Sequence, residues 1–498
     1  MSDIEKHSAH ASLAAPEPHT GSGLSRFAYR TPLVQIILVG FVCFLCPGMF
    51  NALSGTGGGG QLDATAADNG NVALYTTFAV VGFCAGAICN YLGIRYTLMI
   101  SGFGYALYAG SLLCYNHTQS DAFVIAAGAI LGVCAACLWT AQGAIMMSYP
   151  IESHKGRYIS IFWAIFNTGA VIGAIIPVAE NWNNDTGTVG DGTYIAFMIL
   201  MIVGAGLAAT LAKPETVIRP DGSHVAIPRQ TTPMQEIKGL LMCLKTDTYI
   251  VALFPLFFAS NWFYTYQFND YNGYFFNIRT RSLNSLMYWL MQIVGAGFFG
   301  YFLDMHQFSR RTRAISGWIL VFVLVNVIWG GGLAMLFQTH RGEPTKFHPD
   351  GGPHGKGMDV SDGGYAGRLW LYMFYGFLDA IWQTYAYWLM GALSNDPRKL
   401  AYFAGFYKGI QSAGAAIIWR IDALKKPFDA IFGSSWGLCG VALVCALPVI
   451  LMKVGNHSVD GVGEKGVGGL GPQGVLGGVI DEQKVGEPRV TAERVSST

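Results

Sequence analysis

Long apolar segments recur along this chain of 498 residues and constrain its fold more than any other feature. A membrane-spanning helix needs about 20 mostly apolar residues to cross about 30 Å of hydrocarbon. Twelve segments have this character: residues 33–53, 72–92, 96–115, 121–147, 158–180, 193–212, 248–268, 284–303, 314–337, 368–394, 402–420 and 434–453. Charged residues make up only 12% of the chain, about half the share usual in soluble domains. The sequence therefore predicts an all-α, polytopic membrane protein with twelve transmembrane helices in two six-helix bundles.

Charge and composition exclude other classes of protein. The chain carries 31 Lys and Arg against 30 Asp and Glu, whereas nucleic-acid binding needs a basic surface. No Ser/His/Asp grouping falls on neighbouring spans, so we expect no enzymatic activity. The pairs Cys43/Cys46 and Cys134/Cys137 have metal-like spacing but lack His or acidic partners nearby, which favours helix packing over metal binding. We therefore expect no catalytic residue, metal, cofactor or nucleic-acid partner.

Basic residues indicate the orientation of the chain, because cytoplasmic loops are enriched in Lys and Arg. Arg95, Lys155 and the Arg310–Arg313 run lie on loops of the same predicted side. We expect a multi-pass protein with both termini in the cytoplasm, in either the plasma membrane or an endomembrane. The sequons at Asn116 and Asn184 then fall on the opposite side, where glycosylation is possible.

Composition divides the chain into five parts. Residues 1–32 are polar, lack the apolar core of a signal peptide and predict a disordered cytoplasmic N-terminus. Residues 33–212 and 248–453 hold the two predicted bundles, and the basic, Pro-containing segment 213–247 is expected to be a cytoplasmic linker. Residues 454–498 are rich in Gly and Val and predict a disordered cytoplasmic tail.

The two halves show an internal repeat. Trp139 in the fourth span corresponds to Trp382 in the tenth, and Asn167 in the fifth corresponds to Gln411 in the eleventh. A parallel repeat of six spans is the layout of the major facilitator superfamily, in which two bundles rock around a site at the membrane midplane.

The loop after the second span resembles that superfamily's best-known motif, Gly-x-x-x-Asp-(Arg/Lys)-x-Gly-(Arg/Lys)-(Arg/Lys). Gly86, Gly93 and Arg95 match it, but Asn90 stands at the acidic position. In the second half, Asp304 supplies the carboxylate. The resemblance implies an inner gate that is formed by Gly86, Asn90, Gly93, Arg95, Asp304, Arg310 and Arg311.

Further stretches resemble the Unc-ninety-three-like family, and its fungal members in particular. They are Asn51-Ala-Leu followed by Gly57–Gln61, Leu138-Trp-Thr-Ala-Gln-Gly143, Tyr149-Pro150, Lys155-Gly-Arg157 and Trp163-x-x-Phe-Asn167-x-Gly169. The similarity covers about residues 33–453. The family is named for a regulatory subunit of a potassium channel, an animal relative escorts Toll-like receptors, and most fungal and plant members are presumed transporters. The resemblance therefore implies the architecture more firmly than the activity.

Ionisable residues within the spans are the main candidates for function, because a charge at the bilayer centre costs roughly 3 kcal/mol or more. Near their midpoints the last six spans carry Asp379 and Lys408, and the first six carry no charge. The tenth and eleventh spans are consecutive and antiparallel, so we expect the two side chains at similar depth, where they could touch. One interpretation is proton coupling, and the other is a static ion pair that fixes the two spans.

Polar and aromatic residues at helical spacing accompany this pair. The candidate substrate or coupling set adds Tyr375, Trp382, Gln383, Gln411, Trp139, Gln142 and Asn167. Such polar residues also often hydrogen-bond neighbouring spans without a further role.

Two functions remain open at this point. The first is a major-facilitator-type secondary transporter of a small organic solute, with proton coupling as an option, that works by alternating access. The second is a non-transporting regulatory or trafficking partner of another membrane protein, such as an ion channel. The charge-free first bundle and Asn90 motivate the second, for which the loops at 181–193 and 338–367 could dock the partner. The expected partners are the lipid bilayer, an unidentified small molecule and, in the second case, a membrane protein.

Overall fold

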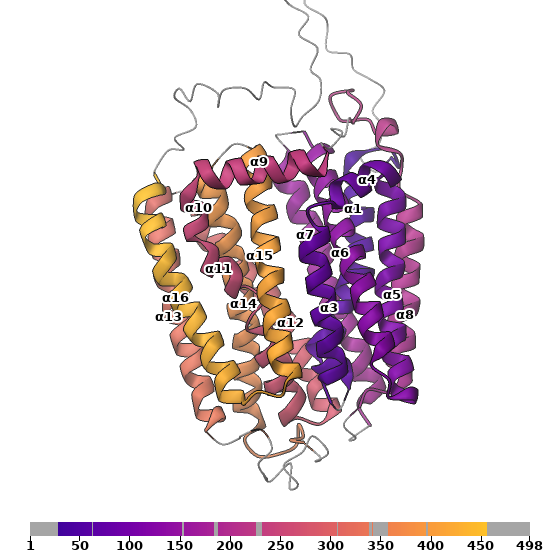
Figure 1. Ribbon diagram of the computed structural model, residues 1–498, viewed down its shortest axis with the longest axis vertical. Helices are drawn as coiled ribbons and strands as arrows, with labels where there is room; N and C mark the ends of the chain where they lie inside the picture. The colour runs from indigo at the N-terminus through magenta and orange to yellow at the C-terminus, as the bar shows by residue number, and fades with distance from the viewer. Residues whose placement is uncertain are drawn as a thin grey trace, which may run out of the picture.

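A computed structural model describes residues 28–455, apart from 62, 152–153, 184–187, 226–231, 306, 338–340, 342–356 and 395–396. Within these ranges the chain is almost wholly helical, and extended pairing is limited to two isolated bridges, Ile218–His224 and Phe276–Met358. Figure 1 shows the long helices side by side in two groups, which correspond to the two halves of the chain. The all-α, multi-span fold expected from the sequence is confirmed.

All six predicted spans of the first half are helical. They are α1 (Pro32–Cys43), which continues through a π-helical turn η1 (Phe44–Gly48) into α2 (Met49–Gly55), then α3 (Thr65–Val81) with α4 (Ala85–Leu92), α5 (Ile94–Thr118), α6 (Ala122–Ser148), α7 (Lys155–Asn181) and α8 (Asp191–Ala209). A short 3-10 turn, η2 (Gly58–Gly60), follows α2. The second span is broken, because α3 and α4 meet at 78°.

The second half is helical as well, with one broken span. Its elements are α10 (Thr248–Ala252), α11 (Phe254–Ala259) and the π-helical η5 (Tyr266–Gly273), then α12 (Ile278–Leu303), α13 (Arg310–Leu336), α14 (Tyr365–Leu393), α15 (Pro397–Ala423) and α16 (Phe428–Lys453). The first three together occupy the place of the seventh predicted span. The segment expected to be a linker contains a 3-10 turn, η4 (Pro214–Thr216), and a helix, α9 (Pro233–Thr246).

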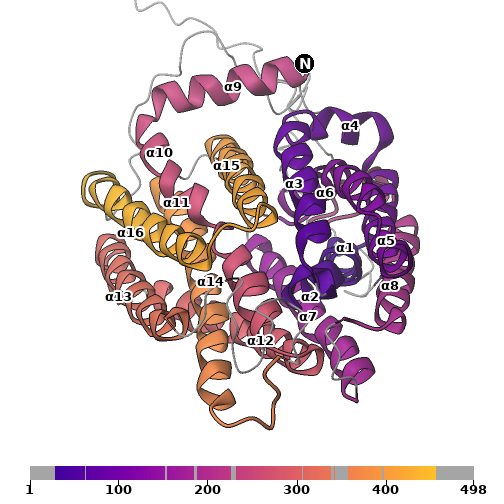
Figure 2. The same ribbon diagram turned by 60° about the horizontal axis from the view of Figure 1, so that its bottom comes forward.

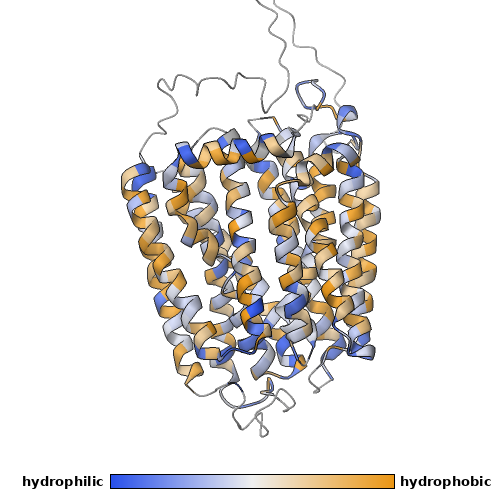
Figure 3. Cartoon of the chain, in the orientation of Figure 1, coloured by the Kyte–Doolittle hydropathy of each residue, from blue (hydrophilic) through white to orange (hydrophobic). Residues whose placement is uncertain are grey.

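Eight of these described helices are long and apolar enough to cross a membrane alone, and the bent α3–α4 pair adds a ninth. The remaining three predicted spans are the broken seventh, α14 and α15. Polar residues such as Asp379 and Lys408 lie within α14 and α15, so these helices depend on packing inside the protein. Figure 3 shows hydrophobic residues along the helix lengths and hydrophilic residues gathered at both ends.

The two halves contact each other mainly through α3 against α15 and α7 against α12. Figure 2, which views the molecule more nearly along the helices, separates the two groups. We call the end that carries α9 the α9 end, and the opposite end, where α3 and α12 begin, the distal end. Helix α1 begins and α16 ends at the α9 end (Figure 1).

Candidate functional site

The predicted charged pair in the second half is bridged by two glutamines. Gln383 donates to Asp379 Oδ1 at 3.4 Å, and Gln411 donates to Gln383 Oε1 at 3.2 Å. Lys408 Nζ in turn donates to Gln411 Oε1 at 2.9 Å. The direct contact that the sequence allowed between Asp379 and Lys408 is absent, because the two amide side chains fill the space between these described residues.

Asp379 is held by neutral donors. Its side chain is buried, and Oδ2 accepts hydrogen bonds from the Tyr288 hydroxyl at 3.1 Å and from Gln292. The Tyr264 hydroxyl also faces this carboxyl group. The Tyr288 hydroxyl lies 2.8 Å from Gln267 Oε1 as well. The single hydroxyl proton of Tyr288 thus faces two acceptors, Gln267 Oε1 and Asp379 Oδ2. Both hydrogen bonds form when Asp379 is protonated, because Tyr288 then donates to Gln267 and accepts from Asp379.

Lys408 is stabilised without a carboxylate partner among the described residues. Its Nζ lies 5.1 Å from the ring centre of Tyr407 and 5.6 Å from that of Tyr387. Such cation–π contacts contribute roughly 0.5–2 kcal/mol each. The cation is therefore held by two rings and Gln411, independently of Asp379.

The other predicted residues divide into separate groups. Trp382 donates to Ser260 Oγ at 3.1 Å beside the glutamine bridge, whereas Tyr375 packs among the rings of Trp329 and Tyr271 in the interior of the second bundle. Trp139 stacks on Trp163 in the first bundle. Gln142, on α6, is buried and Asn167, on α7, is half-buried. Within the described part of the chain, the structure does not bring Trp139, Gln142 or Asn167 into hydrogen-bonding contact with Asp379 or Lys408.

The residues predicted for an inner gate lie at the α9 end in two sets. Gly86 and Asn90 are on α4, Gly93 separates α4 from α5 with φ +77°, and Arg95 begins α5. In the second half, Asp304 caps the end of α12, Arg310 and Arg311 open α13, and Arg311 donates to the Leu451 carbonyl at 3.1 Å.

Of the two sequons, Asn116 lies at the distal end of α5, where its amide nitrogen donates to Asp191 Oδ1 at 2.9 Å. Asn184 lies outside the described residues.

A small cavity that the sequence did not reveal lies between the two halves. The first half contributes Phe50, Asn51, Ser54, Asn71 and Tyr75, and the second contributes Tyr264, Phe268, Trp289 and Trp419. Its volume of about 50 Å³ is room for a few water molecules. Trp289 and Trp419 are more than nine-tenths buried, and their indole nitrogens have no hydrogen-bond partner among the described residues. The lining is therefore uncharged and largely aromatic, and the two buried indole nitrogens belong to residues of its wall.

Backbone contacts join the two halves at the distal end. Arg281 on α12 is fully buried and donates to the carbonyls of Gly57 at 2.6 Å and Gln61 at 3.1 Å. Asn272 donates to the Gly55 carbonyl at 2.9 Å. A Cβ added to Gly57, whose φ is +79°, would lie 2.2 Å from the Phe268 carbonyl oxygen. The glycine run after α2 is thus required for this close approach.

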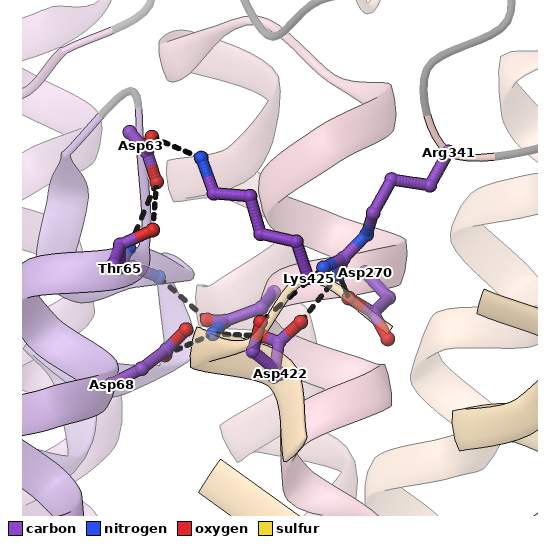
Figure 4. Close-up of polar contacts among 9 residues, drawn as sticks. Asp63, Thr65, Asp68, Asp270, Arg341, Asp422 and Lys425 are labelled. Carbon is purple, nitrogen blue, oxygen red and sulfur yellow. Dashed lines mark hydrogen bonds and ion pairs between the residues drawn. The ribbon is translucent and has the colours of Figure 1, made fainter. Parts of the chain in front are cut away.

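Three buried carboxyl groups meet at the same end, and we call Asp68, Asp270 and Asp422 the distal acid cluster (Figure 4). Asn269 Nδ2 donates to Asp68 at 2.6 Å and to Asp422 at 2.9 Å. Arg341 Nη2 lies 2.7 Å from Asp270 and also pairs with Asp422. Sequence reasoning missed these residues, since each stands near the end of its span, where a charge normally reaches water.

The fold is that of the major facilitator transporters. The structure matches a partially occluded, inward-open xylose transporter XylE from E. coli with a TM-score of 0.54 and 13% sequence identity, over 87% of this chain and 98% of that one. This likeness concerns the fold alone.

Sequence comparison identifies the family. The model of the ion channel regulatory protein UNC-93 family matches residues 59–330. The UNC93-like protein C922.05c of Schizosaccharomyces pombe is 52% identical over 427 residues, which cover 86% of this chain and 84% of that protein. UNC93-like protein 1 of Arabidopsis thaliana is 43% identical over 464 residues, or 93% and 97% of the two chains. The chain therefore belongs to the UNC93-like family.

Proposed function

We propose that this protein is a secondary transporter of a small organic solute that works by alternating access and is coupled to protons through Asp379. The observation that carries the proposal is the aromatic cavity between the two halves, whose wall includes Trp289 and Trp419, two residues with indole N–H groups that have no hydrogen-bond partner among the described residues. Major facilitator transporters bind their substrate between two bundles near the midplane. At about 50 Å³ the cavity has to widen in another state of the transport cycle to admit a solute that offers hydrogen-bond acceptors and a flat apolar surface.

The position of Asp379 supports coupling. Tyr264 lines the cavity and faces Asp379. A change in the protonation of the carboxyl group would therefore change the hydrogen bonding of a residue in the cavity wall. Because the single hydroxyl proton of Tyr288 lies between Gln267 and Asp379, the protonated form of Asp379 is favoured in this state.

The test is a screen of solute uptake and efflux by the purified protein in liposomes, with and without a pH gradient. For a solute that is transported, Trp289→Phe and Trp419→Phe should raise the KM several-fold, because each removes a donor and keeps a ring. The matched control is Trp329→Phe, which removes another buried, unpartnered indole N–H outside the cavity. Equal effects of all three substitutions would argue against the cavity as the substrate site.

Asp379→Asn tests the coupling separately. We expect the variant to exchange solute across the membrane but to lose accumulation driven by a pH gradient. Accumulation at the wild-type level would contradict a coupling role.

Regulation of another membrane protein is the second candidate function, and the description of the family as ion channel regulatory favours it. A chain that moves no solute of the screen, but whose loss from intact cells changes a membrane current, would support this function instead.

A further inference from the structure

The distal acid cluster joins the two halves of the molecule through groups of the same charge. Asp68 belongs to α3 in the first half, and Asp422 belongs to α15 in the second. Both carboxyl groups contact the same amide nitrogen of Asn269, and Asp422 faces Asp68 directly. Two carboxyl groups on opposing bundles therefore lie in contact at the closed end.

Among the described residues, the cluster has fewer positive charges than carboxyl groups. Arg341 serves both Asp270 and Asp422, while the contact described for Asp68 is the neutral amide. Asp270 is 1% exposed, and its Oδ2 has no hydrogen-bond partner among the described residues.

The charged and titratable groups near the cluster contact other residues. Lys425 pairs with Asp63 at 2.7 Å, and Arg420 donates to Asn69 at 2.9 Å. Arg281 on α12 donates to backbone carbonyls, and Tyr108 on α5 lies 3.4 Å from Asn71. If all three carboxyl groups were ionised, negative charge would remain buried without a partner, which is strongly unfavourable.

A bound proton reduces this excess of negative charge, and the described residues favour a proton over a metal ion. Within the described chain no group of three or more His, Cys, Asp or Glu side chains has an arrangement that could hold a metal. A proton on Asp68 would turn its contact with Asp422 into a carboxyl–carboxylate hydrogen bond. It would lower the net charge of the three carboxyl groups and Arg341 from −2 to −1, with Arg341 shared between Asp270 and Asp422.

We propose that the distal acid cluster is a proton-binding latch. In the closed state Asp68 and Asp422 share a proton across the two bundles. Release of this proton toward the distal side leaves two facing carboxylates, whose repulsion separates α3 from α15 and opens that end. The latch rests on the proposed function, because the separation of α3 from α15 is the opening step of alternating access.

The test measures distal opening without any solute. The full-length protein in nanodiscs, with its native cysteines replaced, would carry spin labels at Ser120→Cys and Gly363→Cys, two exposed distal positions in different halves. The distribution of label distances is recorded from pH 5 to pH 9. We expect a single short distance at low pH and a growing long-distance population as the pH rises.

Variants assign the effect to the cluster. Asp68→Asn should keep the short distance at every pH, because the amide cannot ionise. If Asp68→Asn fails to fold, Asp270→Asn gives an independent readout: it removes one negative charge, so the opening midpoint should move to higher pH. The matched control Asp63→Asn, which breaks the exposed pair with Lys425, should leave the midpoint unchanged.

A distance distribution that does not change with pH, or the same pH response in Asp68→Asn and Asp270→Asn as in the unsubstituted labelled protein, would overturn the latch. Because the measurement needs neither solute nor gradient, failure of the transport screen and failure of the latch are distinguishable.

Discussion

Asp379 and Lys408 each have their own neutral surroundings. Gln383 and Gln411 separate the two ionisable groups, and Tyr288 and Tyr407 complete the contacts on either side. A direct ion pair, the static role left open from the sequence, is therefore not formed between them, and each side chain has partners of its own.

The glutamine bridge predicts partial coupling of substitutions at its two ends. Because Asp379, Gln383, Gln411 and Lys408 form one hydrogen-bond network, we expect the effects of Asp379→Asn and Lys408→Met on stability to depart from additivity by roughly 0.5–3 kcal/mol, without recovery of the unsubstituted protein's stability in the double variant. A buried ion pair would instead give single variants that lose roughly 3–5 kcal/mol and a double variant that recovers. Unfolding midpoints of the four proteins in detergent measure this, and recovery in the double variant would contradict the structure.

Asp359, in the loop before α14, gives a prediction about pH. Arg279 hydrogen-bonds this carboxylate through two nitrogens, and Asn277 donates to it at 2.9 Å, which holds the pKa of Asp359 below its ordinary value although partial burial opposes the shift. A lowered folded-state pKa contributes stability above the ordinary value of about 4, and this stability is lost as the pH falls toward the lowered pKa.

Asp359→Asn should therefore cost about 1 kcal/mol at pH 7, since the pair is partly exposed, and much less near pH 3. Unfolding measured at the two pH values checks this difference. As a control, Asp362→Asn replaces a neighbouring carboxylate, which accepts a hydrogen bond from the backbone amide of Asp359, and should leave most of the acid dependence in place. An equal loss for Asp359→Asn at both pH values would show that the ion pair is not the cause.

At the scale of elements, the glycine turn η2 and the π-helical η5 set how closely the two halves meet. Gly57 contacts the backbone at Phe268 and Gly273, where no side chain can fit. Gly93, between α4 and α5, also has positive φ, but a Cβ added there would have no atom within 4 Å.

These two glycines form a matched pair for substitution. Gly57→Ala and Gly93→Ala both incur the left-handed backbone cost of roughly 1 kcal/mol, and Gly57→Ala must in addition push η5 away from η2. We expect Gly57→Ala, and not Gly93→Ala, to lengthen the distance between the two distal spin labels at low pH. If the two substitutions have the same effect on that distance, the turn does not control distal closure.

Helix α9 shows how a polar segment can still be ordered. Pro233 begins the helix, and Thr232 and Gln235 form a capping box at its start. Met234 and Leu241 remain 60% exposed on a helix that also carries Lys238 and Lys245. Because such a helix can lie in the plane of the membrane interface, α9 spans the segment between the two bundles as a surface helix.

At the scale of the whole molecule, α1 begins and α16 ends at the α9 end (Figure 1), and the distal acid cluster lies at the other end. The basic loops predict that the α9 end is cytoplasmic. Membrane-impermeant thiol reagents should then label Ser120→Cys in intact cells, and Lys245→Cys on α9 only after permeabilisation. The unsubstituted cysteine-free chain is the control, and labelling of both positions from one side would refute this orientation.

The sequence by itself determined the all-helical, multi-span fold and the family, and it placed Asp379 and Lys408 within the spans. These features are local, because apolar length and helical spacing are properties of consecutive residues. The broken seventh span and α9 were harder to foresee, since their short helices depend on contacts with neighbours such as α15 and α16.

Tertiary structure alone decided which side chains meet. Asp68, Asp270 and Asp422 come from α3, η5 and α15, and each reads in sequence as a solvated end of a span. Only the packing of the two halves buries the three together and leaves Arg341 shared between Asp270 and Asp422. Likewise, Gln383 and Gln411 reach across from adjacent helices and separate two charges that sequence spacing had placed at one depth. Such contacts depend on how helices distant in sequence approach each other, and no local pattern records that approach.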